Sequence, residues 1–206
     1  MNNLQKRILT SLILLPTSLF FIVAGGNYIV SFLYAILILA NFEAFSSFKR
    51  KLSIIFLDII LVIALLSLLH LRNDTVSSYI LLLWVIILTI SSDIGGYIFG
   101  KIFKWKKFTK ISPNKTLSGV LGSLIFSIIS LFLLAITVNF LFNLDYSFVI
   151  KTKYFLLALI LSLVSQIGDL IVSYLKRLEK IKDTGKILPG HGGIFDRVDG
   201  LMFSII

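Results

Sequence analysis

The chain has 206 residues, of which 57% are hydrophobic and only 15% are charged, and its mean hydropathy is +0.99. This composition excludes a soluble globular domain, and the absence of cysteine excludes disulfides and thiolate metal sites. The formal net charge of +10 is compatible with an acidic partner such as nucleic acid or with an anionic membrane surface, and the positions of the basic residues distinguish the two.

Six apolar runs are long enough to cross about 30 Å of hydrocarbon, which takes about 20 residues of helix. In chain order they cover residues 8–24, 28–48, 53–71, 76–98, 118–142 and 153–175. We expect helices because a segment in lipid must satisfy its own backbone hydrogen bonds. The predicted fold is therefore all-α: a polytopic integral membrane protein with about six to seven transmembrane helices, forming a single transmembrane domain over residues 1–206.

The basic residues are distributed unevenly between the predicted loops. With the N-terminus in the cytosol, 17 of the 20 lysines and arginines lie on the cytosolic side, and only Arg72, Lys151 and Lys153 lie on the other. Loops rich in lysine and arginine stay in the cytosol, so this asymmetry predicts a cytosolic N-terminus. Most of the positive charge therefore sets the orientation in the membrane and faces anionic lipid headgroups. No nucleic-acid partner is expected. The polar segments 101–116 and 176–199 then share one side.

Four acidic residues lie inside or at the edge of these apolar runs. A carboxylate at the centre of a span costs about 2.5–3.5 kcal/mol on insertion scales, so each needs a partner or a function. Asp58 lies in unbroken apolar sequence with no motif around it, and we interpret it as structural. Glu43 lies near the cytosolic end of its span, and the sequence leaves it open between a structural and a functional role. The other two are Asp93 and Asp169.

Asp93 begins a segment that combines glycines, lysines and a Ser-Pro pair. Glycines in a span let two helices approach closely, which is the simplest explanation for Gly95, Gly96 and Gly100. Ser112 and the proline after it are expected to open the next helix, where free amide groups can bind phosphate. The lysines between positions 101 and 110 are interpreted as headgroup contacts.

The densest block of chemistry follows Asp169. Asp169, Ser173, Lys176 and Arg177 recur at intervals of three and four, so they share one helix face, with an acid at its base and two cations at its rim. Lys176 lies two helical turns from Asp169, which favours metal ligation by the acid over a structural salt bridge. Further on, Asp196 and Asp199 are three residues apart and would face one site if helical.

A glycine-rich turn separates these acidic groups. Residues 189–193, Pro-Gly-His-Gly-Gly, predict a tight turn in which glycines admit a phosphate close to backbone N–H groups. The spacing is not that of a P-loop. His191 could be a metal ligand, a proton shuttle or a hydrogen-bond donor to phosphate, and as a lone histidine it argues against zinc. Carboxylates beside phosphate-binding cations favour Mg²⁺.

Two segments resemble a known family. Residues 173–199 match the C-terminal signature of the phosphatidate cytidylyltransferases (CDP-diacylglycerol synthases) at every fixed position, including Ser-x-apolar-Lys-Arg, Lys-Asp, His-Gly-Gly and Asp-Arg-apolar-Asp. Residues 111–119 resemble the family's second stretch, Ile-Ser-Pro-Lys-Lys-Thr-x-Glu-Gly, with Asn114 and Ser118 as departures. Since family members usually continue into another helix after Asp199, we expect this chain to be cut short there or to end in a partial helix.

The resemblance implies an enzyme that converts CTP and phosphatidate to CDP-diacylglycerol and pyrophosphate, with Mg²⁺ and room for a second cation. It implies a bacterial inner membrane with the active site facing the cytosol, membrane lipids as partners, and a homodimer as an open possibility. A CTP-dependent lipid-alcohol kinase and a polytopic transporter are the alternatives, although no internal repeat of the transporter kind is found.

The same resemblance, taken with the chemistry above, gives the expected site residues. The expected catalytic residues are Asp169, Lys176, Arg177, His191, Asp196 and Arg197, and the expected metal ligands are Asp169, Asp196 and Asp199. The expected substrate-binding residues are Asp93, Ser112, Lys115, Thr116, Ser173, Lys182, Asp183, Gly192 and Gly193.

Overall fold

The computed structural model describes every residue except 1–2, 73–74, 108, 110, 114 and 143–150. The described residues form helices and no named strand, as expected for apolar segments that satisfy their own backbone hydrogen bonds. The helices are α1 (Asn3–Ala24), α2 (Gly26–Ser47), α3 (Lys51–Leu71), α4 (Val76–Phe103), α5 (Leu117–Phe142), α6 (Thr152–Leu178) and α7 (Phe195–Ser204).

Five of these helices, α2 to α6, are long and apolar enough to cross a membrane, and α1 contains a shorter apolar helix over Ile8–Ala24. This confirms the predicted all-α polytopic membrane protein. All six apolar runs are helical, and five of them are long and apolar enough to span. Helix α4 continues past the predicted end at residue 98 to Phe103, because the glycine-containing segment stays helical. Helix α7 has 10 residues and is too short to span.

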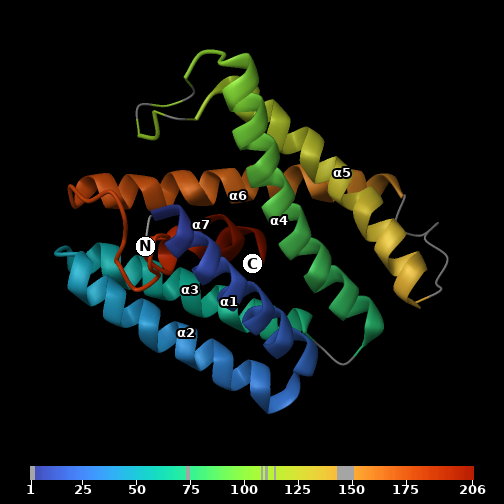
Figure 1. Cartoon of the computed structure of the whole chain (residues 1–206), viewed down its shortest axis with the longest axis horizontal. Helices are drawn as coiled ribbons and strands as arrows, with labels where there is room; N and C mark the ends of the chain where they lie inside the picture. Colours follow the sequence, from blue (N-terminus) through green and yellow to red (C-terminus); the bar gives the residue numbers. More distant parts are fainter. Residues whose placement is uncertain (1–2, 73–74, 108, 110, 114, 143–150) are drawn as a thin grey trace.

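The helices form two groups that α6 connects (Figure 1). Helix α7 packs against α6 and also contacts α3 and α4, while α2 packs on α3. Helices α4 and α5 form an extensive pair beside this group. Their closest approach is at Gly95 and Gly122, where a Cβ on either glycine would collide with the carbonyl oxygen of the other. The predicted role of these glycines in close helix packing is therefore confirmed.

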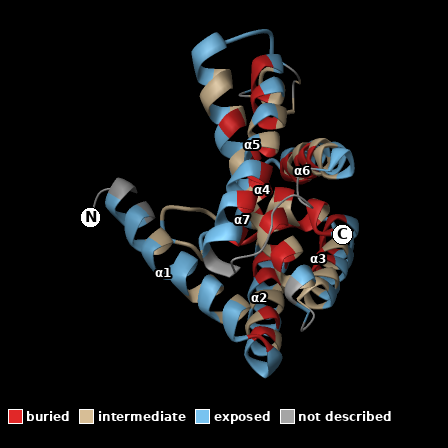
Figure 2. Ribbon diagram, turned by 90° about the vertical axis from the view of Figure 1, so that its right-hand side faces the viewer, coloured by how far each residue is buried: buried red, intermediate tan, exposed pale blue. Residues whose placement is uncertain are grey.

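Two apolar cores hold the helices together. The larger core lies among α2, α3, α4, α6 and α7 and includes the fully buried Leu57, Val172 and Phe195. The smaller core joins α4, α5 and α6 around Trp84. Figure 2 shows buried residues concentrated where these helices meet, whereas α1 is largely exposed and packs mainly against α2. The short α7 is thus held inside the bundle, which places its carboxylates against α6.

Candidate active site

The two polar segments singled out in the sequence meet at Asp169 of α6. The Lys115 ammonium, from the segment that precedes α5, lies 2.5 Å from the Asp169 carboxylate and also donates to the carbonyl oxygen of Gln166 at 3.2 Å. The Ser173 hydroxyl donates to the same carboxylate at 3.3 Å. The inference that the nearest cation to Asp169 lies two turns away is wrong, because Lys115 reaches it from a different part of the chain.

Helix α7 brings a second carboxylate to the same place. The side chains of Asp199 and Asp169 are in hydrogen-bonding contact. Burial, and then the neighbouring Asp169 carboxylate, raise the pKa of Asp199 well above its ordinary value, and the charge of Lys176 offsets only part of this effect. Burial and the neighbouring carboxylate therefore both favour the protonated form of Asp199, in which it can donate a hydrogen bond to Asp169. Asp93 of α4 lies within electrostatic range of Asp169 and Lys115.

Asp196, at the start of α7, is held differently. Its Oδ1 lies 2.7 Å from the Lys176 ammonium, and both side chains are largely buried, at 7% and 10% exposed. Its Oδ2 accepts hydrogen bonds from the amides of Thr184 at 2.8 Å and Gly193 at 3.0 Å. Burial would raise the pKa of Asp196, but the Lys176 and amide hydrogen bonds outweigh it and hold this pKa below its ordinary value.

The glycine-rich segment forms the predicted tight turn. Gly190 and Gly192 have φ angles of +79° and +88°, in the region that favours glycine, and the Leu188 amide donates to the Gly192 carbonyl at 3.0 Å. The amides of His191 and Gly192 donate to the Leu188 carbonyl, at 2.9 and 3.2 Å. Since the Gly193 amide donates to Asp196, these amides are engaged within the protein. The prediction that this turn offers free backbone N–H groups to a phosphate is therefore wrong for these three amides.

The Ser-Pro pair lies in the turn before α5 and not at the first residues of that helix, where it was expected. Helix α5 begins at Leu117, and the Thr116 hydroxyl accepts a hydrogen bond from the Gly119 amide at 3.1 Å, which is an N-cap interaction. The Ser112 carbonyl accepts the Lys115 amide at 3.0 Å in the turn before it. The prediction that Ser112 opens the helix is wrong, because the threonine caps it instead. The turn instead places Lys115 beside α6.

The two signature arginines bind backbone carbonyls of this region. Arg177 donates to the Ile181 carbonyl at 3.1 Å, and Arg197 donates twice to the His191 carbonyl, from Nε at 3.0 Å and from Nη2 at 2.7 Å. Both arginines are exposed, and so are Lys182 and Asp183. These four polar side chains therefore lie at the accessible rim of the site, where the remaining guanidinium N–H groups can meet an anion.

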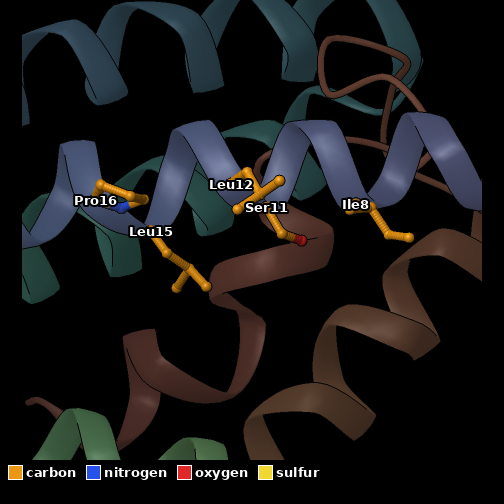
Figure 3. A pocket seen from close by; sticks show the side chains of 5 residues that line it. All are labelled: Ile8, Ser11, Leu12, Leu15 and Pro16. Atoms are coloured by element: carbon orange, nitrogen blue, oxygen red, sulfur yellow. The ribbon is translucent and has the colours of Figure 1, made fainter.

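Helix α1, which the sequence analysis did not connect with the site, contacts the glycine-rich turn. The Thr10 hydroxyl donates to the Pro189 carbonyl at 2.8 Å, and the Ser11 hydroxyl lies 3.3 Å from Nε2 of His191. A hollow of about 410 Å³ opens beside this helix, lined by Ile8, Ser11, Leu12, Leu15 and Pro16. In Figure 3 the side chains of Ser11 and Leu15 point toward the C-terminal part of the chain. An apolar hollow thus adjoins the polar site.

A magnesium ion commonly uses one or two protein carboxylates together with substrate phosphates and water. Within the described part of the chain, no three acidic or histidine side chains are close enough to form a complete metal site. The contacting pair Asp169 and Asp199 fits the usual magnesium requirement, because two carboxylates in contact need either a proton or a cation between them. Asp196 fits it less well, because Lys176, two backbone amides and the Thr184 hydroxyl already surround its two oxygens.

Comparisons with known proteins identify the family of the chain. The sequence profile of the Cytidylyltransferase family matches residues 45–206. The chain is similar to the phosphatidate cytidylyltransferases of Helicobacter pylori (strain ATCC 700392 / 26695), at 39% identity over 128 residues, and of Staphylococcus haemolyticus, at 42% over 125 residues. These alignments cover 61% and 60% of this chain but 44% and 45% of the relatives. The chain therefore spans less than half the length of the curated relatives it matches.

Proposed function

The chain belongs to the cytidylyltransferase family, and we propose that it transfers the cytidylyl group of CTP to phosphatidate, giving CDP-diacylglycerol and pyrophosphate. The observation that carries this proposal is that the Asp169 carboxylate contacts Lys115 of one family-like segment and Ser173 of the other, so that both segments meet in one site. The names of the similar proteins from Helicobacter and Staphylococcus support the choice of phosphatidate as the acceptor.

The proposed step is an in-line displacement at the α-phosphorus of CTP. An oxygen of the phosphatidate phosphate forms the new bond, and the bond from the α-phosphorus to the oxygen bridging the β-phosphorus breaks, so that its electron pair leaves with pyrophosphate. The attacking oxygen is already anionic and requires no strong base. The protein then contributes mainly by positioning the two phosphates and by neutralising their charge.

The described residues divide these tasks. Asp169 and Asp199 would hold a magnesium ion, whose charge lowers the repulsion between the two reacting phosphates. Lys115 and Lys176 lie beside these carboxylates, where they can share in that neutralisation. Lys182, Arg177 and Arg197 at the rim, with His191, would bind the triphosphate or the departing pyrophosphate. Asp196 keeps Lys176 and the glycine-rich turn in place.

The surroundings suit one lipid and one water-soluble substrate. The apolar hollow beside α1 offers space for acyl chains next to the polar site, so phosphatidate can approach within the bilayer. CTP would arrive from the cytosol, which is the side predicted by the basic loops. We place the protein in a bacterial inner membrane, consistent with its bacterial relatives. A homodimer remains a prediction for the whole protein.

The test is pyrophosphate release by the full chain purified in detergent, with CTP and Mg²⁺, in the presence and absence of phosphatidate. The proposal expects pyrophosphate and CDP-diacylglycerol only when both substrates are present. A lipid-alcohol kinase would instead form CDP from CTP and a lipid alcohol, without pyrophosphate. The variant Asp58→Asn is a suitable control, because it removes an acid of α3 that is outside the proposed site.

A further inference from the structure

Glu43 is an acid of α2 to which the proposed reaction assigns no role, although it is among the most deeply buried side chains, at 1% exposed. Its Oε1 accepts a hydrogen bond from the Thr184 hydroxyl, and its Oε2 accepts one from the Ile194 amide at 2.7 Å. Thr184 and Ile194 are the first and last residues of the segment 184–194, which contains the glycine-rich turn. One carboxylate therefore fastens both ends of this segment to α2.

The Glu43 carboxylate also accounts for the two glycines near the ends of this segment, because its side chain fills the space beside them. A Cβ on Gly185 would lie 2.6 Å from the Glu43 Cγ, and a Cβ on Gly193 would collide with its Oε1. Gly185 fills the small position of the signature, and Gly193 is the last glycine of His-Gly-Gly. Both positions admit only a hydrogen as side chain, because the Glu43 side chain occupies the space inside the loop.

The tether continues into the active site. The Thr184 hydroxyl also lies 3.1 Å from Oδ2 of Asp196, so it is placed between two carboxylates. Asp196 in turn holds Lys176, and Ile194 directly precedes α7, which carries Asp199. Fixing Ile194 and Thr184 therefore fixes where α7 begins and how its carboxylates face α6.

Burying this acid is costly, which argues for a task beyond packing. None of the ion pairs formed among the described residues involves Glu43. A buried carboxylate without a cation is retained only when hydrogen bonds compensate its lost hydration, and a neutral residue would serve simple helix packing at lower cost. The two hydrogen bonds it accepts both come from the segment that builds the site.

We propose that Glu43, acting with Thr184, is a positioning residue that holds the segment 184–196 in its catalytically competent form. This inference rests on the proposed cytidylyltransferase function. Glu43 touches neither substrate phosphates nor the Asp169–Asp199 pair in this account, and it acts through the turn and through α7. Its loss should therefore lower turnover while leaving the magnesium requirement unchanged.

The experiment compares Glu43→Gln, Thr184→Val and Thr184→Ser in the full chain. Glutamine cannot accept both hydrogen bonds, valine keeps the shape of threonine without its hydroxyl, and serine restores that hydroxyl. We expect kcat to fall about tenfold or more in the first two variants, because small misplacements of reacting groups are costly. We expect Thr184→Ser to stay near wild type, and the magnesium concentration for half-maximal rate to be unchanged throughout.

Hydrogen exchange of the segment 184–196 supplies a readout that needs no substrate. We expect exchange there to become about tenfold faster in Glu43→Gln and Thr184→Val, and to stay unchanged elsewhere. The matched controls are Asp58→Asn, which removes another acid within a span, and Thr137→Val, which removes a hydroxyl bonded only within its own helix to the Leu133 carbonyl. Both controls should keep wild-type exchange in this segment and wild-type turnover.

The outcomes separate this inference from the proposed function. Unchanged exchange in Glu43→Gln overturns the tether, and faster exchange with full turnover overturns its positioning role. Because both residues act through one contact, the double variant Glu43→Gln with Thr184→Val should lose no more turnover than the worse single variant; additive losses contradict the inference. A wild-type chain with no pyrophosphate release overturns the proposed function, while the exchange data still decide whether Glu43 holds the segment.

Discussion

The Lys115 ammonium lies 2.5 Å from the Asp169 carboxylate, and this one contact ties the segment before α5 to the second half of α6. Around it, α7 adds Asp199 against Asp169, and Asp196 against Lys176. The two partners of each of these contacts therefore come from different segments of the chain. The site exists only when α5, α6 and α7 are packed together.

Removing either member of the Lys115–Asp169 pair should abolish turnover with little effect on insertion. Asp169→Asn loses the negative charge that both a hard cation and Lys115 require, and Lys115→Met loses the matching positive charge. We expect pyrophosphate release to fall at least about 100-fold in each. Lys106→Met, which removes an exposed lysine of the same basic segment, is the matched control and should keep most activity. Wild-type rates for Asp169→Asn at low Mg²⁺ would remove Asp169 from the metal site.

Asp199→Asn should separate folding from magnesium use. Because burial and Asp169 raise the pKa of Asp199, its carboxyl favours the protonated form, and an asparagine amide can donate to Asp169 in the same way. The variant should therefore unfold near the wild-type temperature in a chelator. Added Mg²⁺ should raise the wild-type unfolding temperature, since a ligand that binds only the folded state stabilises it, and should leave the variant unchanged. Equal stabilisation of both proteins would exclude Asp199 as a ligand.

The same carboxyl predicts a pH dependence in the chelator. A pKa raised on folding contributes stability at pH values below the ordinary pKa of 3.8 and loses that contribution as pH rises through the folded-state pKa. Wild-type stability should therefore decline with rising pH more steeply than that of Asp199→Asn. The measurement is the unfolding temperature of both proteins across a series of buffers from acid to neutral pH. If the unfolding temperatures of the two proteins changed with pH in parallel, the raised pKa of Asp199 would be contradicted.

Asp196 should behave in the opposite sense. Its pKa is held below 3.8 by Lys176 and two amides, so its contribution to stability is present above that pH and is lost as pH falls through the lower folded-state pKa. Asp196→Asn leaves the largely buried Lys176 without its anion, which should cost about 3–5 kcal/mol of unfolding free energy at neutral pH. The variant's deficit should shrink in acid. A deficit that stays constant with pH would show that the charge of Asp196 is not what matters.

Much of the architecture follows from local pattern. Apolar runs of sufficient length predicted every long helix. Asp196 and Asp199 were expected to face one site only if they were helical, and the structure places both in α7. Composition and periodicity suffice here because a helix in lipid satisfies its backbone internally, so its length and apolarity are dictated by the bilayer. Gly95 and Gly96 likewise predicted that this helix packs closely on another, although they did not identify α5 as its partner.

The long-range partners could not be read in this way. Nothing in the local sequence indicates that Lys115 meets Asp169, or that Glu43 accepts the Ile194 amide, because these contacts depend on how separate helices pack. Glu179 is a similar case: its carboxylate accepts the amides of Lys49 and Arg50 at 3.1 Å, at the start of α3, although no motif marked it. The amides of the His-Gly-Gly turn were misjudged for a different reason. Their acceptors, the Leu188 carbonyl and the Asp196 carboxylate, lie only three or four residues away, but they are reached only in one particular backbone conformation of the turn.

The orientation in the membrane can be tested by labelling. The chain has no cysteine, so Lys106→Cys and Lys186→Cys, both at exposed positions, introduce single reactive thiols. Both should react with an impermeant reagent only from the cytosolic side, and Ser77→Cys only from the opposite side. Labelling of positions 106 and 186 from opposite faces would contradict the positive-inside assignment and a shared site.

The central claim is that the α-phosphoryl group of CTP, with its cytidine, moves to phosphatidate at the site built around Asp169. The most direct measurement supplies the full chain with phosphatidate and CTP carrying a radiolabel on either the α- or the γ-phosphate, and follows the label into the lipid fraction. We predict that the α-label enters the lipid, that the γ-label leaves as pyrophosphate, and that Asp169→Asn does neither. Transfer of the γ-label to lipid, or equal α-label transfer by Asp169→Asn, would contradict the account.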